Sequence, residues 1–316
     1  MEYAFKSIAI IGRYVSASNM VASNITGSTV SACALSQGQL ESQAQTHAQL
    51  LELVQHLSAK KIDICIEEKT ALHTGLAGYP TIHIDQIGRH AELAIVLGGD
   101  GTMLSVARAI VGDNIPLVGI NRGRFGFLTD ISADNMLANI DTILAGKFSI
   151  ERRMLLSAEV YRGDENISKM LGQGVALNDV IIKSGLRLIE LEVKIDGQFV
   201  HKQRSDGLIV STPTGTTAYA LSSGGPILHP KLDAIALVPI SPHTLSYRPI
   251  AISSTSRIEI TLIQADVTHL SLDGQIEIML QQGDKVIVTR AEKTVPLLHL
   301  QDYSYYEMLR NKLNWG

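Results

Sequence analysis

The sequence predicts an α/β domain followed by an all-β domain: a Rossmann-like α/β domain that carries a G-G-D-G-T turn, and then an antiparallel β-sandwich domain. Up to about residue 150, short apolar runs alternate with stretches of helical periodicity, which is typical of a parallel sheet covered by helices. Beyond it, the hydrophobic period changes to two, which indicates antiparallel strands. We expect the first domain to cover 1–149, completed by the C-terminal tail 298–316, and the β-rich domain to cover 150–297.

The first elements form a βαβ unit with a long connection. Residues 7–12 (SIAIIG) are a short apolar run closed by glycine, which predicts a buried strand. Between 14 and 43, Ser, Ala, Thr, Asn and Gln dominate without a sustained period, and we interpret this segment as a mobile insertion. Apolar residues return at helical spacing from Leu40 to Leu57, and 62–66 is the next predicted strand.

A second strand–turn–helix unit follows. An apolar strand at 92–97 leads into G-G-D-G-T at 98–102, and apolar residues then recur at helical spacing over 103–111. A strand at 117–120 and a helix at 136–144 continue the pattern. The first part of the chain is therefore predicted to be a repeating β/α array.

The second part of the chain alternates apolar and polar residues, most clearly before an Asp196-Gly197 turn, which is a strong hairpin signal. We expect strands at 189–195, 258–262 and 285–289. Ser304 and Glu307 have the spacing of a capping box in front of a last amphipathic helix. We expect this helix to return to the first domain.

The composition excludes several classes of protein. The net charge of −4 and the lack of a basic block give no footprint for nucleic acid. Cys33 and Cys65 are too few for a disulfide framework, which indicates a reducing, cytoplasmic location. No apolar run approaches the length needed to span a bilayer. We therefore expect a soluble protein that binds neither nucleic acid nor membrane.

The G-G-D-G-T turn at 98–102 predicts a phosphate site. Glycines between a strand and a helix let backbone N–H groups and the positive helix end approach an anion. Asp100 stands beside this site, where a carboxylate is repelled by phosphate unless it binds a metal or takes a proton from an attacking hydroxyl. The alternative is an aspartate that only caps the helix.

A long hydroxyl- and glycine-rich segment, 204–226, predicts a second binding element. Its small hydrogen-bonding side chains suit a ligand with many hydroxyls, such as a sugar or nucleotide, and Tyr219 offers a ring for stacking a base. Arg204 and Asp206 stand at its root. The alternative is a β-connection stabilised by Ser and Thr turns.

Two shorter motifs carry little signal alone. Asn178-Asp179 reads most simply as an Asx turn, and Asp273-Gly274-Gln275 as a hairpin turn. The histidines, His229 and His243 among them, lack the spacing of a zinc site.

Together, the motifs resemble those of NAD kinases, and the C-terminal motifs resemble the bacterial branch. The shared motifs, in order, are G-G-D-G-T at 98–102, N-R-G-x-F-G-F-L-T-D at 121–130, N-D at 178–179, S-D-G-L-I-V-S-T-P-T-G-T-T-A-Y at 205–219, G-G-P-I-L at 224–228, P-H-T-L-S at 242–246, D-G-Q at 273–275, D-Y-S-Y-Y at 302–306 and K-L-N-W at 312–315. G-G-D-G-T also occurs in lipid kinases, whereas the T-P-T-G-x-T-A-Y loop is much more specific.

The resemblance implies transfer of the γ-phosphoryl of ATP to the 2′-hydroxyl of the adenosine ribose of NAD, with Mg²⁺ on the ATP phosphates and no direct protein ligand to the metal. It implies that Asp100 is the catalytic residue and that the ATP phosphates lie on Gly98, Gly99, Gly101 and Thr102. The NAD-binding residues that it implies are Asp100, Gly101, Phe127, Asn178, Asp179, Arg204, Asp206, Thr217, Ala218, Tyr219, Ser222 and Gln275.

The resemblance also assigns roles within this set. Phe127 would pack by the adenosine, Asn178 and Asp179 would hold the nicotinamide ribose, and Asp206 would face the carboxamide. It further implies a homotetramer or homodimer with the site near a subunit interface, where Arg204 and Asp206 act on a neighbouring subunit.

The sequence departs mildly from the family pattern. Asp179 stands where Glu is more common, Phe125 replaces a common Leu and Thr216 a common Ser. Two rival hypotheses stay open: a lipid kinase, which needs an apolar cleft for an acyl chain, and an NAD-sensing protein without turnover.

Overall fold

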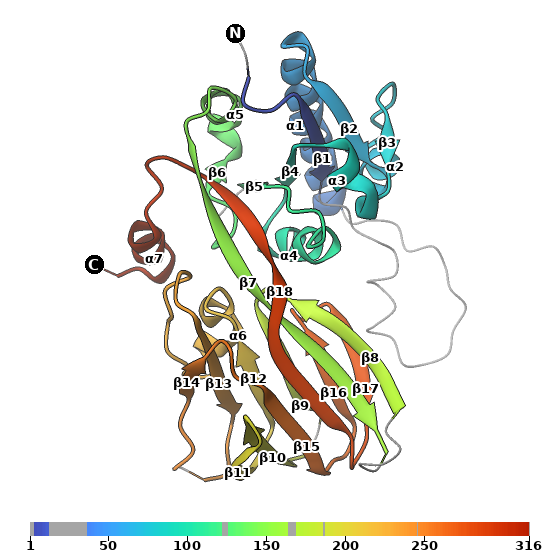
Figure 1. Cartoon of the computed structure of the whole chain (residues 1–316). Coiled ribbons are helices and arrows are strands. Elements are labelled where there is room, and N and C mark those ends of the chain that lie inside the picture. Colours follow the sequence, from blue (N-terminus) through green and yellow to red (C-terminus); the bar gives the residue numbers. More distant parts are fainter. Residues whose placement is uncertain are drawn as a thin grey trace. The chain divides into compact units, whose positions relative to one another are not determined.

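The computed structural model describes residues 3–12, 37–121, 126–163, 169–185, 187–244 and 246–315, with the side chains of the first helix described from Ala44 onward. The chain divides into two compact units, one made of Met1–Glu151 with Pro296–Gly316 and the other of Arg152–Val295. Figure 1 shows that the first unit combines a sheet with helices, whereas the second consists mainly of strands. The predicted fold class, α/β followed by antiparallel β with a C-terminal helix, is confirmed.

The first unit is built on a parallel sheet in the order β5-β4-β1-β2-β3. Its strands are β1 (Ser7–Gly12), β2 (Asp63–Glu67), β3 (Thr81–Ile82), β4 (Leu93–Leu97) and β5 (Leu117–Asn121), with β6 (Ile131–Ser132) beside β5. After β1 the chain adds β2 and β3 on one side of the sheet, and after β4 it adds β5 on the other side. The topological switch point therefore lies between β1 and β4, where α/β proteins bind ligands at the carboxyl ends of the strands.

Helices flank this sheet (Figure 1). They are α1 (Gln37–Ala59), α2 (Glu68–Thr74), α3 (Ile87–His90), α4 (Asp100–Ala109), α5 (Met136–Leu144) and α7 (Tyr305–Leu313), with 3-10 turns at Ile84–Gln86 and Ala133–Asn135. The apolar stripes of α1 and α5 pack in one core with the sheet. Ser304 caps α7 as predicted, because its hydroxyl accepts a hydrogen bond from Glu307 N at 3.3 Å.

The predicted insertion 14–43 is too long at its C-terminal end, because α1 begins at Gln37. Residues 37–43 contain Gln, Leu and Glu, which are good helix formers, and they continue into the buried stripe that starts at Leu50. The preceding part of the insertion, 14–36, lies outside the described residues.

The second unit is a sandwich of two sheets. One has the order β14-β13-β12-β9-β16-β17, and the other contains β11-β10-β15-β18 with β7 and β8. Their strands are β7 (Phe148–Arg162), β8 (Lys169–Ala176), β9 (Asp179–Ser184), β10 (Ile189–Ile195), β11 (Gln198–Ser205), β12 (Gly207–Ser211), β13 (Ala234–Ile240), β14 (Ile250–Ser253), β15 (Ile258–Gln264), β16 (Thr268–Leu272), β17 (Ile276–Leu280) and β18 (Lys285–Leu300). The strand predicted at 285–289 is thus much longer and continues into the first unit.

The two faces of the β9 sheet have different partners. Val180 and Ile182 pack in the core between the sheets. The alternate residue Ile181 packs on the opposite face with α6 (Tyr219–Ser222), as the period-two geometry of a strand requires. Asp179 therefore shares the α6 face.

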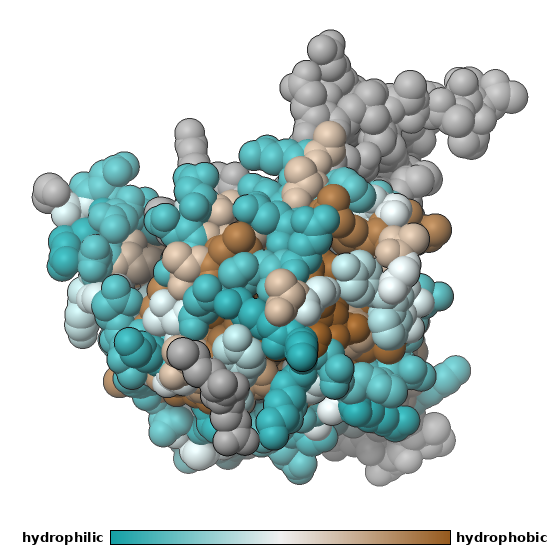
Figure 2. Space-filling model, turned by 90° about the horizontal axis from the view of Figure 1, so that it is seen from above, coloured by the Kyte–Doolittle hydropathy of each residue, from teal (hydrophilic) through white to brown (hydrophobic). Residues whose placement is uncertain are grey.

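The surface seen in Figure 2 is largely hydrophilic, with small apolar patches between the polar side chains. Such a mixture is ordinary for a folded protein. Across the described part of the chain, no helix is long and apolar enough to cross a membrane.

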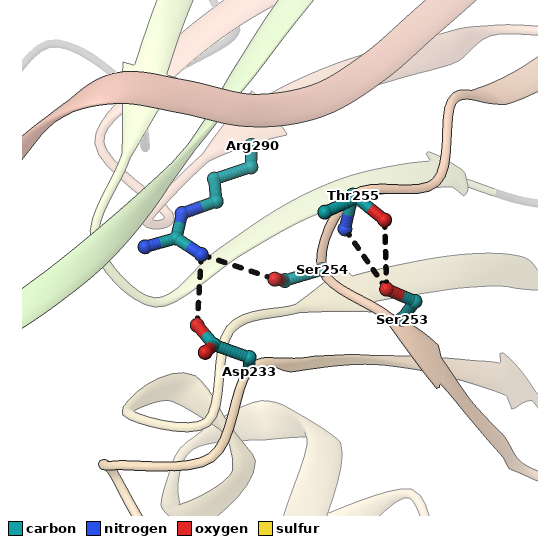
Figure 3. Close-up of polar contacts among 5 residues, drawn as sticks. All are labelled: Asp233, Ser253, Ser254, Thr255 and Arg290. Carbon is teal, nitrogen blue, oxygen red and sulfur yellow. Dashed lines mark hydrogen bonds and ion pairs between the residues drawn. The ribbon is translucent and has the colours of Figure 1, made fainter.

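Two ion pairs of the second unit differ in how far their acids are exposed to solvent. Arg290 donates to Asp233 Oδ1 at 2.8 Å and to Ser254 Oγ at 3.2 Å, and Asp233 is 79% exposed (Figure 3). Arg162 instead binds Asp284 through two hydrogen bonds of 2.7 Å, and the Asp284 side chain is 0% exposed. The second pair has the stronger geometry, because it is bidentate and its acid is desolvated.

We expect Arg162→Met to lower the free energy of unfolding by about 2–3 kcal/mol, because it leaves a buried carboxylate without its cation. Arg290→Met, the matched change at the exposed pair, should cost less than about 1 kcal/mol. Urea unfolding followed by circular dichroism measures both losses. Equal losses would contradict the distinction.

Candidate active site

The G-G-D-G-T turn joins β4 to α4 at the switch point of the parallel sheet. Gly98 N donates to Ile120 O at 2.9 Å, which holds the turn against β5. Gly99 O accepts the first hydrogen bonds of α4, from Thr102 N and Met103 N, at 2.9 and 3.1 Å. The turn therefore ends at a helix N-terminus, which attracts an anion through its N–H groups and its dipole.

The Asp100 carboxylate reaches from this turn to the loop 126–129. Its Oδ2 accepts from Phe127 N at 2.8 Å, and its Oδ1 accepts from Leu128 N at 3.0 Å and from Thr129 Oγ1 at 3.4 Å. Asp100 thus fixes a second loop of the same unit, which goes beyond the helix-capping role that the sequence left open. The G-G-D-G-T and G-F-L-T-D motifs form one hydrogen-bonded group.

Gly126 makes this arrangement possible. A Cβ atom at this position would lie 1.8 Å from Asp100 Oδ1 and 2.4 Å from Thr129 Oγ1. Gly126 N also donates to Thr129 Oγ1 at 3.1 Å, and Asn121 Nδ2 donates to the same oxygen at 3.1 Å. The glycine is therefore required by close approach. The residues between them, 122–125, lie outside the described part of the chain.

The Phe127 ring is half-buried and has a cation from the C-terminal helix nearby. Lys312 Nζ lies 5.8 Å from the ring centroid, within cation–π range. A cavity of about 770 Å³ adjoins this place. It is lined by Gly126, Asp130, Leu300, Asp302, Tyr303, Ser304, Glu307, Met308, Asn311, Lys312 and Asn314. The C-terminal tail thus contributes to the surroundings of the loop 126–129.

In the second unit, the turn at Asn178-Asp179 is held by an acid from another strand. The Asp273 carboxylate accepts from Leu177 N at 3.0 Å, from Asn178 N at 2.7 Å and from Asp179 N at 3.2 Å. The sequence alone favoured a simple Asx turn and a simple hairpin turn for these two motifs. The structure shows that they contact each other.

The T-P-T-G loop contacts the same turn. Thr212 Oγ1 donates to Leu177 O at 2.6 Å and accepts from Gly215 N at 3.1 Å, while Thr212 N donates to Asn178 O at 2.9 Å. A Cβ atom at Gly215 would lie 2.1 Å from Asn178 O. Three motifs that are distant in sequence therefore form one cluster in this unit.

Asp179 is the electrostatically unusual residue of this cluster. Its side chain is buried, and burial raises its pKa to about 7, with a further contribution from the negative charge of Asp273. The carboxyl group therefore changes its charge near neutral pH.

Residues 217–222 lie on the α6 face of the sheet. Thr217 and Ala218 are half-buried and Ser222 is exposed. Lys183 Nζ lies 5.5 Å from the centroid of the Tyr219 ring. Thr216, where the family more often has Ser, is buried, and its hydroxyl donates to Pro213 O at 2.6 Å and accepts from Leu228 N at 3.0 Å.

Three of the predicted NAD-binding residues lie away from this cluster or at its edge. Asp206 precedes β12 and accepts from Ser184 N at 3.0 Å, whereas Asp179 pairs with the other end of β12. Asp206 and Ser211, the residue that pairs with Asp179, are five residues apart along the strand, which is about 16 Å at roughly 3.3 Å per residue. Arg204 lies on β11 before Asp206, and Gln275 is exposed within the β16–β17 turn.

Sequence reasoning missed two residues of the second unit. Asp273 looked like a turn residue, since D-G is a common hairpin pair. Arg153 is buried, and its Nη1 donates to Thr214 Oγ1 of the T-P-T-G loop at 3.3 Å. Its position on a strand gave no signal, because the contact spans about sixty residues of sequence.

Metal ligands are sparse in the described ranges, where no group of three or more His, Cys, Asp or Glu side chains could hold a metal ion. His229 Nδ1 accepts from Lys231 N at 3.2 Å, and His243 N donates to Arg204 O at 2.9 Å.

Known proteins match both units. The family model of the ATP-NAD kinase N-terminal domain matches residues 39–148, and that of the ATP-NAD kinase C-terminal domain matches 177–300. The NAD kinase of Thiobacillus denitrificans is 49% identical over 85% of this chain and 92% of its own length. That of Ralstonia nicotianae is 44% identical over 98% of this chain and 93% of its own length.

Solved structures share the fold. Yeast NADH kinase complexed with NADH has a TM-score of 0.78 at 22% identity, over 97% of this chain and 86% of its own. An NAD kinase from Archaeoglobus fulgidus in complex with ATP has a TM-score of 0.69 at 20% identity, over 98% of this chain and 100% of its own. The family models and the bacterial relatives establish the family: the chain belongs to the NAD kinases.

Proposed function

We propose that the Asp100 carboxylate, fixed by the loop 126–129 at the N-terminal end of α4, orients and activates the hydroxyl that receives the phosphoryl group. The chain is an NAD kinase, which transfers the γ-phosphoryl of ATP to the 2′-hydroxyl of the adenosine ribose of NAD and makes NADP. The hydrogen bonds of Asp100 are the observation that carries the proposed role.

The chemistry requires positioning and charge stabilisation, because phosphoryl transfer passes through a loose transition state and needs no enzyme nucleophile. A carboxylate has about four lone-pair sites. The loop 126–129 uses three hydrogen bonds of Asp100, which leaves about one acceptor site for a substrate hydroxyl. The backbone N–H groups at Gly98–Thr102 would hold the phosphates.

The residues near Asp100 fit a magnesium ion that arrives with ATP. Mg²⁺ usually keeps several waters and binds through substrate phosphates with one or two carboxylates at most. The G-G-D-G-T turn supplies only one acid, Asp100, whose remaining acceptor site is assigned to the substrate hydroxyl, so the turn offers no protein cage for the ion. When bound, Mg²⁺ would neutralise charge on the phosphates, and the phosphates and water would hold it.

We assign the NAD-binding role to both units. Phe127 is supported by its place beside Asp100, with its ring half-buried. Asn178 and Asp179 are supported by their fixed turn, and Tyr219 by its position on the α6 face. Gly101, Thr217, Ala218, Ser222 and Gln275 complete the proposed set.

We assign Arg204 and Asp206 to the site of a neighbouring subunit in a homotetramer or homodimer. Support comes from the distance along the strand, about 16 Å, between Asp206 and Ser211, the residue that pairs with Asp179. Mixing two inactive variants tests this role. If Asp206 acts in trans, Asp100→Asn and Asp206→Ala subunits should together regain activity after dissociation and reassociation. A mixture as inactive as its components would contradict the assignment.

A coupled assay tests the function itself. Purified chain with ATP, Mg²⁺ and NAD should form NADP, detected by an NADP-specific dehydrogenase, and omission of ATP should abolish the signal. Phosphorylation of diacylglycerol in preference to NAD would favour the lipid-kinase hypothesis. NAD binding without turnover would favour the sensing protein.

A further inference from the structure

Two hairpins of the second unit close on Asp-Gly, but only one of these acids needs a further explanation. Asp196-Gly197 has φ angles of 51° and 76°, and Asp273-Gly274 has 53° and 65°, so both pairs adopt the left-handed backbone of tight hairpin turns. The Asp196 side chain is exposed and accepts from Arg257 N at 2.8 Å. Asp273 is only 8% exposed. An exposed aspartate, Asp196, thus satisfies the geometry of this turn. The turn alone therefore does not explain why Asp273 is buried.

Asp273 is bound to the Asn178–Asp179 turn in both directions. Its carboxylate accepts three consecutive backbone N–H groups, from Leu177 to Asp179, at 2.7–3.2 Å. Its own backbone N donates to Asp179 O at 3.0 Å. The carboxylate therefore fixes the backbone of the turn.

The negative charge of Asp273 affects the pKa of Asp179. Burial raises the pKa of Asp179 to about 7, and the charge of Asp273 adds to this rise. Other groups lie on this face of the sheet. Lys183 lies four residues beyond Asp179 on β9 and is paired with His269 of β16. Tyr219 of α6 lies over the same face, near Lys183. Asp273 is the charged neighbour that acts on Asp179.

We propose that Asp273 is a positioning residue for NAD: it orients the Asn178–Asp179 turn and acts on the Asp179 carboxyl group, an inference that rests on the NAD site proposed above. A ribose hydroxyl donates best to an ionised carboxylate. Binding of NAD should therefore strengthen as pH rises through about 7, because the acid of Asp179 loses its proton over that range.

Asp273→Asn tests the proposal through the pH profile of kcat/KM for NAD. The asparagine side chain has no negative charge. Its NH₂ group is itself a donor, so it cannot accept from one of the three backbone N–H groups that Asp273 binds. KM for NAD should rise about ten- to a hundredfold with a smaller change in kcat, since one hydrogen bond to a charged group corresponds to about a tenfold effect. The inflection expected for wild type near pH 7 should move to lower pH, because the repelling charge is gone.

Asp196→Asn is the matched control, because it makes the same change in an Asp-Gly turn with an exposed acid. It should leave KM and the inflection unchanged. If Asp273→Asn lowers kcat/KM without moving the inflection, Asp273 is merely structural and the proposal fails.

Asp179→Asn separates this proposal from the NAD site on which it rests. It keeps Asp273 and its three acceptor contacts, and it should raise KM for NAD and abolish the inflection. An unchanged KM would remove Asp179 from the NAD site. Should Asp273→Asn not fold, carbon-13 NMR titration of the wild-type carboxyl groups decides instead: Asp179 must titrate near 7, and titration near its ordinary value of about 4 overturns the proposal.

Discussion

Asp100→Asn should lower kcat by about 10²–10⁴-fold, the usual contribution of a general base, while NAD still binds. The amide cannot take a proton from the attacking hydroxyl. It keeps one oxygen to accept from Phe127 N or Leu128 N, so part of the contact with the loop survives. Steady-state kinetics with NAD and ATP give kcat, and equilibrium dialysis with labelled NAD gives the affinity.

Asp113→Asn is the matched control for this substitution. Asp113 belongs to the same unit, and its carboxylate also accepts a backbone hydrogen bond, from Gly88 N at 3.1 Å. It lies outside the proposed site, so its replacement should leave kcat close to the wild-type value. Near-normal turnover of Asp100→Asn would refute the assigned role.

Gly126→Ala should have the next largest effect, a loss of kcat of about a hundredfold with a loss of stability of about 1–3 kcal/mol. The new methyl group would overlap Asp100 Oδ1, only 1.8 Å from the ideal Cβ position, so either the acid or the loop 126–129 must move. Kinetics and thermal unfolding measure the two losses separately.

Gly185→Ala provides the comparison, since a Cβ atom there meets nothing within 4 Å. Its effect on stability should stay within about 1 kcal/mol, with unchanged kcat. A Gly126→Ala enzyme that matches it in both measurements would show that the close approach to Asp100 is not required for catalysis.

Local patterns predicted several elements of the fold well. The apolar run at 7–12 is β1, the stripe at 136–144 is α5, and the alternation at 189–195 is β10. These predictions succeed because burial of one face imposes a period on the sequence. The start of α1 at Gln37 was harder, because its apolar residues begin only at Leu40. The full length of β18 was also not predicted.

The motifs were found by sequence, but their partners were not. G-G-D-G-T was interpreted as a phosphate turn from its sequence, whereas the hydrogen bonds that Asp100 accepts from Phe127 N and Leu128 N join residues 27 and 28 positions apart. Asp273 and Asn178 are 95 positions apart. No period or spacing encodes such contacts, since they depend on how strands pair.

The sequence by itself determined the two unlike domains, the family and the acid of the G-G-D-G-T turn, because periodicity and short motifs are local properties of a chain. Only the tertiary structure decided which backbone groups hold Asp100, why Gly126 must lack a side chain, and that Asp273 lies against Asp179. Hydrogen bonding, steric overlap and the pKa of a buried acid all depend on neighbours that folding brings from distant parts of the chain.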